Sequence, residues 1–165
     1  MTRMYRTLSL VLVSLLLLAQ SAFATDRRGR LGVGMSNQLK NDQPAIHFKI
    51  QKSSSFAFGG LAGVSTRDVG GGHGFGVKVY RNLFDEPQLT FYTSVLAALI
   101  KEKTLTGDDE GFQFDLTVGS EFSFAGLQSL GFSFETGLSF NKINSEFGIE
   151  TVGYHFITAG ILFYL

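Results

Sequence analysis

Phenylalanine alternates with small or polar residues in two long stretches of this sequence, and the alternation limits the folds open to the chain. In residues 112–124, every second position except Ser120 is apolar, and the positions between them carry Gln, Asp, Thr, Gly, Glu and Ser. Residues 130–142 repeat the pattern. Because successive side chains of a β-strand point to opposite faces, each stretch predicts a strand with one apolar and one polar face.

The same period of two recurs along the rest of the chain, in most places more weakly. The further candidate strands are residues 29–36, 45–52, 56–65, 74–81, 88–101 and 153–165. Compact connections at 53–55, 82–87 and 125–129 largely alternate with longer polar ones at 37–44, 66–73, 102–111 and 143–152. Such alternation is typical of antiparallel strands that run up and down. We therefore predict an all-β domain of eight strands.

The first residues of the chain have the pattern of a secretory signal peptide. Arg3 and Arg6 precede an apolar run from Leu8 to Leu18, and Ala22-Phe23-Ala24 supplies the small residues of a cleavage site. The run is about half of the roughly 20 residues that a membrane-spanning helix needs, which disfavours an uncleaved anchor. We expect residues 1–24 to be removed and residues 25–165 to form one exported domain.

Charge and cysteine content exclude several classes of function. Of 14 basic residues, Arg3 and Arg6 belong to the signal peptide, so 12 remain against 14 acidic ones, and a basic face for nucleic acid is not expected. The chain has no cysteine, so it has neither disulfides nor thiolate chemistry.

The size of the apolar side chains predicts which face of the sheet is outside. Most of the phenylalanines fall on one face, and Gly, Ser, Ala and Thr with some charged residues fall on the other. An eight-stranded barrel has an interior only wide enough for its own side chains, so the rings would overfill it. We predict an eight-stranded antiparallel up-and-down transmembrane β-barrel with the rings facing lipid and both termini in the periplasm. A soluble periplasmic barrel with inverted faces is the alternative.

The last strand carries a recognisable spacing of residues. Thr158, Gly160, Phe163 and Leu165 match a C-terminal assembly signal, in which a polar residue and a glycine precede two hydrophobic residues. With the signal peptide and the strand count, the chain resembles the small eight-stranded outer-membrane β-barrels of Gram-negative bacteria, of the OmpA transmembrane-domain and OmpX type. Leu165 departs from the usual final aromatic residue, which we expect to weaken recognition.

The resemblance implies the location and the partners of the protein. It implies residence in the cell outer membrane, contact with membrane lipid and lipopolysaccharide, and recognition of the C-terminal strand by the barrel-assembly machinery. It also implies a monomer and no cofactor.

Five charged residues fall on the predicted inner face of the barrel. They are Lys49, Lys78, Asp115, Glu121 and Glu135. Isolated charges in a narrow lumen are costly, so we expect these residues to form ion pairs, although the sequence does not specify the partners. The facing of two strands is ambiguous because both of their faces carry apolar residues. In strand 88–101, Leu96, Ala98 and Ile100 would point inward, and in strand 153–165, Phe156, Leu162 and Tyr164 would do so.

No motif predicts a catalytic or metal site. Neither His47 nor His155 has a serine two residues later, as lipid A deacylases of this size require. The glycine-rich run 70–74 lacks the Lys-Ser/Thr of a P-loop. The acidic residues 108–110 do not have the spacing of an EF-hand loop. We expect a structural or surface-interaction role through the four longer loops, with a narrow pore as the alternative and a lipid A-modifying enzyme as a weaker one.

Overall fold

The computed structural model describes residues 26–40, 44–105, 107–143, 146–152 and 157–165, which form nine strands and no helix. The predicted signal peptide, residues 1–24, lies outside the described residues. The strands are β1 (Leu31–Ser36), β2 (Ala45–Gln51), β3 (Phe56–Ser65), β4 (Gly72–Glu86), β5 (Leu89–Thr104), β6 (Gly107–Phe122), β7 (Leu130–Ile143), β8 (Glu146–Thr151) and β9 (Thr158–Tyr164). A search of the described residues finds no helix with the length and apolar character that crossing a membrane requires.

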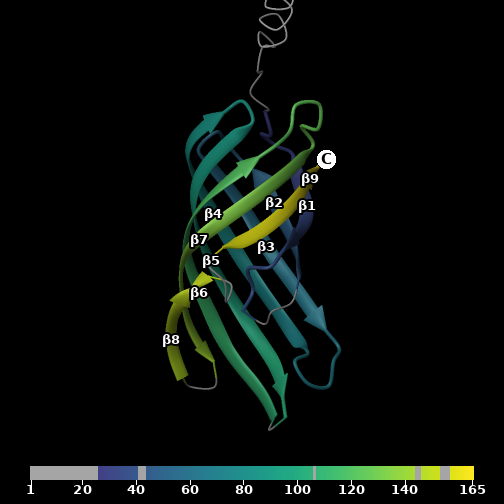
Figure 1. Cartoon of the computed structure of the whole chain (residues 1–165), viewed down its shortest axis with the longest axis vertical. Helices are drawn as coiled ribbons and strands as arrows, with labels where there is room; N and C mark the ends of the chain where they lie inside the picture. The colour runs from purple at the N-terminus through teal and green to yellow at the C-terminus, as the bar shows by residue number, and fades with distance from the viewer. Residues whose placement is uncertain (1–25, 41–43, 106, 144–145, 153–156) are drawn as a thin grey trace, which may run out of the picture.

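Eight of the strands form a closed ring. Each strand from β1 to β7 pairs antiparallel with the next, β7 also pairs with β9, and β9 pairs with β1 to close the barrel. Strand β8 lies outside the ring and pairs with the second half of β7 (Figure 1). The prediction of an all-β, eight-stranded antiparallel barrel is therefore confirmed.

Two predicted connections are wrong because they contain paired strands. The predicted loop 143–152 contains β8, which pairs with Leu138–Ile143 of β7. The predicted loop 102–111 contains the paired ends of β5 and β6, where Lys101 lies opposite Glu110 and Lys103 lies opposite Asp108. In the β5–β6 hairpin, opposite charges on cross-strand pairs stabilise the pairing where the apolar alternation has ended, so these two strands extend beyond the apolar pattern.

The predicted limits of three other elements also change. Strand β4 continues to Glu86 through an irregularity between Asn82 and Phe84, so the predicted connection 82–87 shrinks to a turn at Pro87 and Gln88. The predicted strand 153–165 begins at Thr158, and residues 153–156 lie outside the described part of the chain.

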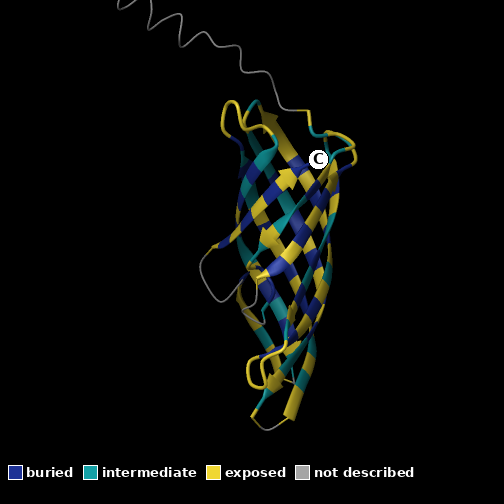
Figure 2. Cartoon of the chain, turned by 90° about the vertical axis from the view of Figure 1, so that its right-hand side faces the viewer, coloured by how far each residue is buried: buried dark blue, intermediate teal, exposed yellow. Residues whose placement is uncertain are grey.

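Burial alternates along the strands, as the sequence pattern predicts. In β2, for example, His47 and Lys49 are buried and Ile46, Phe48 and Ile50 are exposed. The exposed and buried positions form a chequered pattern over the barrel wall (Figure 2). The phenylalanine face is therefore the outer face, and the polar face is the inner one.

The two strands of ambiguous facing have apolar residues on both sides of the wall. Leu96, Ala98 and Ile100 of β5 are buried, as are Leu162 and Tyr164 of β9. The barrel interior is consequently apolar in part.

The described termini meet at one end of the barrel, which we call the terminal end, together with the turns at 52–55, 87–88 and 123–129 (Figure 1). The Arg30 guanidinium donates a 2.8 Å hydrogen bond to the Tyr164 carbonyl, and the Leu165 amide donates one of 2.9 Å to the Leu31 carbonyl. The opposite end, which we call the far end, carries residues 37–40, the loop 66–71 and the tip of the β5–β6 hairpin.

Candidate functional site

The charged interior of the barrel is the candidate site. All five inward charged residues predicted from the sequence are almost fully buried, with at most 5% of their surface exposed. They come from β2, β4, β6 and β7, because each occupies an alternate position on an amphipathic strand. The structure brings four of them together as two ion pairs and places the fifth, Asp115, apart from both.

The first pair lies at the centre of the interior. The Lys78 ammonium group is 2.6 Å from each carboxylate oxygen of Glu135. Glu135 also accepts hydrogen bonds from the hydroxyl groups of Tyr92 at 2.9 Å and Thr117 at 2.8 Å. Both carboxylate oxygens are thus satisfied, which a buried charge requires.

The second pair lies nearer the terminal end. The Lys49 ammonium group donates a 2.7 Å hydrogen bond to Glu121 Oε2, and the Tyr164 hydroxyl donates one of 2.7 Å to Glu121 Oε1. The Lys49 ammonium group also lies 4.6 Å from the centre of the Tyr80 ring. Such a position over an aromatic face is favourable for a cation.

Arg27 joins the second pair, although it is not among the inward charged residues predicted from the sequence. Its Nη1 contacts Glu121 Oε1, and its guanidinium carbon lies 4.5 Å from the centre of the Tyr164 ring. Arg27 precedes the first strand, so no alternation pattern could assign it to the interior. The segment folds back because Gly29, at a φ of 75°, donates a 2.8 Å hydrogen bond to the Gln51 carbonyl. A positive φ of this size favours glycine.

Asp115 is bound by side-chain amides near the far end. It accepts hydrogen bonds from Gln38 Nε2 at 2.9 Å and Gln113 Nε2 at 2.8 Å. Gln38 also accepts a 2.5 Å hydrogen bond from the Lys78 ammonium group, so one amide links Asp115 to the central pair.

Gln38 and Leu39 insert into the barrel at the far end, although the sequence suggested a surface loop at 37–44. Gln38 and Leu39 are each 1% exposed. Leu39 packs in an apolar cluster with Ala45, Leu61, Leu96 and Ala98. The signal for this insertion was Leu39 itself, an isolated apolar residue in a polar connection; residues 41–43 are outside the described part.

His47 and two of the acidic residues 108–110 considered in the sequence form contacts with other side chains in the described structure. His47 Nε2 is 2.6 Å from the Tyr80 hydroxyl, and His155 lies outside the described residues. On the far-end hairpin, Lys101 Nζ lies 2.6 Å from Glu110 and 3.0 Å from Asp108. These hydrogen bonds raise the pKa of Lys101.

Among the described residues no cluster of three or more His, Cys, Asp or Glu side chains could hold a metal ion.

The four residues of the predicted assembly signal lie on β9 or directly after it. Thr158 and Gly160 are buried and face inward, whereas Phe163 and Leu165 are exposed on the outer wall, at 52% and 69%. At Gly160 the inner wall is tight, because a Cβ atom there would lie 2.6 Å from Ser133 Oγ.

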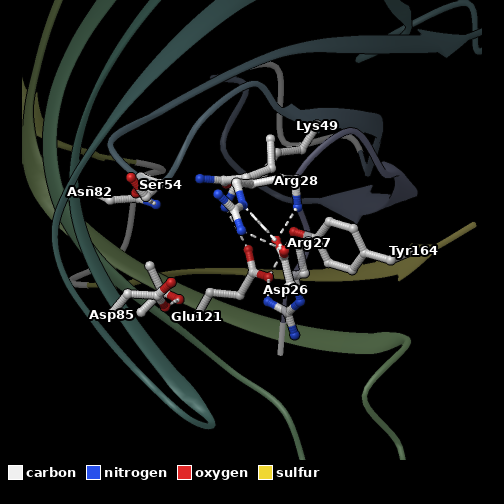
Figure 3. A pocket seen from close by; sticks show the side chains of 11 residues that line it. Asp26, Arg27, Arg28, Lys49, Ser54, Asn82, Asp85, Glu121 and Tyr164 are labelled. Carbon is white, nitrogen blue, oxygen red and sulfur yellow. Dashed lines mark hydrogen bonds and ion pairs between the residues drawn. The ribbon is translucent and has the colours of Figure 1, made fainter. Parts of the chain in front are cut away.

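A cavity of about 390 Å³ opens at the terminal end (Figure 3). Lys49, Glu121 and Tyr164 lie in its deep part with Arg27, and Asp26, Arg28 and Asp85 lie at its exposed rim. Asp26 accepts hydrogen bonds from the Arg28 guanidinium and amide, which lower the pKa of Asp26 to about 2. The cavity is thus lined by polar and charged groups from the N-terminal segment and five strands.

Comparison with known proteins gives no relative: no family model, no curated protein and no solved structure matches this chain. The resemblance to outer-membrane barrels therefore depends on the residues of the chain itself.

Proposed function

We propose that this chain is a small outer-membrane β-barrel protein of the OmpA transmembrane-domain and OmpX type, with a structural or surface-interaction role. The observation that carries the proposal is the division of side chains across the barrel wall. Exposed phenylalanines such as Phe48, Phe58 and Phe114 surround the outside, while Lys78 and Glu135 are buried inside. Lipid is the solvent that favours an apolar exterior around a barrel whose backbone groups are all paired.

The height of the apolar exterior supports a membrane crossing. On β5 the outward positions from Phe91 to Leu99 are uncharged, a span of nine residues that matches the roughly 9–11 residues of a transmembrane strand. Lys101 and Glu110 lie beyond this apolar band towards the far end. Towards the terminal end, the outward residue Arg81 lies opposite Thr93 of β5 and over the Phe56 ring, so the charge-free part of the wall is shorter on β4 than on β5.

The filled interior favours a structural role over transport. The lumen is occupied by the Lys78–Glu135 pair, the tyrosines packed around it and the inserted Gln38. A narrow pore is the second candidate, favoured by the cavity at the terminal end, and it would require the buried ion pairs to separate. Planar-bilayer recordings distinguish the two: we expect no discrete conductance steps, and steps that recur in every preparation would support the pore.

The proposed partners follow from the resemblance and from the exposed surface. Membrane lipid and lipopolysaccharide would contact the apolar band, and the barrel-assembly machinery would recognise β9. At the far end, the loop 66–71 and the described ends of the β5–β6 and β7–β8 hairpins are the regions proposed to meet a surface partner.

Cell fractionation and gel mobility test the proposal. We expect cleavage after Ala24, recovery of the mature protein in the outer-membrane fraction, and a change of mobility in SDS when the sample is boiled. Recovery from the soluble periplasm without a mobility change would contradict the proposal.

A further inference from the structure

The cavity at the terminal end contains an excess of positive charge in its deep part. Arg27 and Lys49 both contact one carboxylate, Glu121, so two cations face one anion. The Arg27 and Lys49 side chains are 10% and 3% exposed, respectively. A desolvated charge without a partner is unfavourable, so this site gains stability if a further negative group enters.

The acidic groups at the rim do not supply that negative group. Asp26 is engaged with Arg28, and both side chains are more than half exposed. Asp85 is exposed and accepts a 2.5 Å hydrogen bond from the Thr90 hydroxyl. Water screens these exposed carboxylates much more than it screens the buried cations.

Arg27 also has hydrogen-bond donors that remain unused. Its Nη1 contacts Glu121, whereas its Nε and Nη2 are buried and have no hydrogen-bond partner in the described part of the chain. The Nε and Nη2 hydrogens lie on one edge of the planar guanidinium group, an arrangement that matches the two oxygens of a carboxylate or phosphate. Packing on the Tyr164 ring holds the plane of the group in place.

We propose that this cavity binds a small molecule through one oxyanion group, a carboxylate or a phosphate. The group enters from the terminal end and is held by the free edge of Arg27 and by the Lys49 ammonium group. The volume of about 390 Å³ lies within the range of small-molecule sites and suits a ligand of a few heavy atoms beyond the anionic group. Asn82, whose Oδ1 is buried and lacks a hydrogen-bond partner among the described residues, provides an acceptor for a donor on the ligand.

This site goes beyond the proposed membrane role and can be tested in detergent micelles. The mature protein, with its folded state checked by gel mobility, is titrated with propionate and separately with inorganic phosphate at constant ionic strength, and amide resonances are followed by NMR. We expect saturable shifts at Arg27, Lys49 and Glu121 with at least one anion. The anion that binds more tightly identifies the group as carboxylate or phosphate.

Matched variants test the role of Arg27. Arg27→Gln should weaken binding at least about tenfold, as expected for the loss of charge-assisted hydrogen bonds. Glu121 keeps Lys49 and Tyr164 as partners in this variant, so the barrel should fold. Arg67→Gln, which makes the same change on an exposed far-end loop, should leave affinity unaltered. Arg27→Lys keeps the charge, loses the paired donors and should bind with intermediate affinity.

The rim provides an independent check. Asp85→Asn removes a negative charge near the entrance and should tighten anion binding, with a larger effect at low salt. The proposal is overturned if neither anion saturates the shifts, or if Arg27→Gln and Arg67→Gln bind equally well.

Discussion

The ammonium group of Lys78 lies 2.6 Å from both carboxylate oxygens of Glu135, and the two residues are 2% and 5% exposed. They come from β4 and β7, which are not neighbours in the sheet, so the pair crosses the lumen. This contact ties opposite walls of the barrel together and makes the interior a bonded network.

Removal of one partner should destabilise the barrel strongly. Lys78→Met leaves Glu135 charged and buried, and we expect a loss of about 3–5 kcal/mol in the free energy of unfolding. The double variant with Glu135→Gln should recover much of the loss, because no uncompensated charge remains. Urea unfolding in detergent, followed by the folded band on gels, measures both changes.

The far-end β5–β6 hairpin provides a control for the Lys78 and Glu135 variants. Lys101→Met removes two ion pairs whose carboxylates, Asp108 and Glu110, are 48% and 68% exposed, so its cost should remain below about 1 kcal/mol. Equal costs for Lys78→Met and Lys101→Met would mean that the central pair is not desolvated in the folded protein.

Two glycines of the inner wall should respond differently to the same substitution. A Cβ atom at Gly119 would lie 2.7 Å from Glu135 Cγ and 2.9 Å from Tyr92 Cζ, whereas one at Gly63 would lie no closer than 3.5 Å to Leu39 Cδ1. We expect Gly119→Ala to cost about 1–3 kcal/mol of overpacking and Gly63→Ala to be tolerated. Thermal unfolding of the two variants tests the packing of the interior, and a greater loss in Gly63→Ala would contradict it.

The Asp26–Arg28 pair at the terminal end predicts a pH dependence. The pKa of Asp26 is lowered from 3.8 to about 2, so this carboxylate contributes stability above pH 3.8 that is lost as the pH falls through about 2. Arg28→Gln should return the pKa towards 3.8, as measured by NMR titration of the carboxyl carbon. Because both side chains are exposed, overall stability at neutral pH should hardly change. A pKa that is unaltered in the variant would show that another group lowers it.

We expect the last residue of the chain, Leu165, to affect how efficiently the barrel is assembled. Leu165→Phe restores the aromatic residue usual in the assembly signal and should increase the folded fraction in the outer membrane. Leu165→Ser should decrease it. Leu127→Ser, a matched change at an exposed residue of the β6–β7 turn, serves as the control. Assembly that is the same in all three variants would argue against recognition through this strand.

The sequence predicted the fold because period-two alternation is strong where one face meets lipid or solvent and the other meets a filled interior. Alternation at 112–124 and 130–142 therefore identified β6 and β7 and their facing. It could not identify the ends of β5 and β6, because charged pairs such as Lys101 and Glu110 carry no apolar signal. Strand β8 was missed for another reason: with six residues it offers only Phe147 and Ile149 as alternating apolar positions.

The sequence predicted which charged residues lie inside the barrel, but not which of them form ion pairs. Inward positions follow from alternation, so the five charged residues could be named, but their pairing depends on strand order and register across the lumen. Arg27 and Gln38 lie outside the strands, and their entry into the interior depends on how each end of the barrel folds back. No local pattern encodes the contacts of Arg27, and for Gln38 the local signal is the neighbouring apolar residue Leu39.

The central claim is that the phenylalanine face of the barrel meets lipid, and fluorescence quenching by lipid tests it most directly. The chain contains no tryptophan, so a single one can be introduced at a chosen position. Leu116→Trp places the indole on the outer wall in the apolar band, and Leu105→Trp places it at the exposed tip of the β5–β6 hairpin. In vesicles with brominated acyl chains, we predict strong quenching of the tryptophan at position 116 and little at position 105. Equal, weak quenching at both positions would mean that the phenylalanine face does not meet lipid.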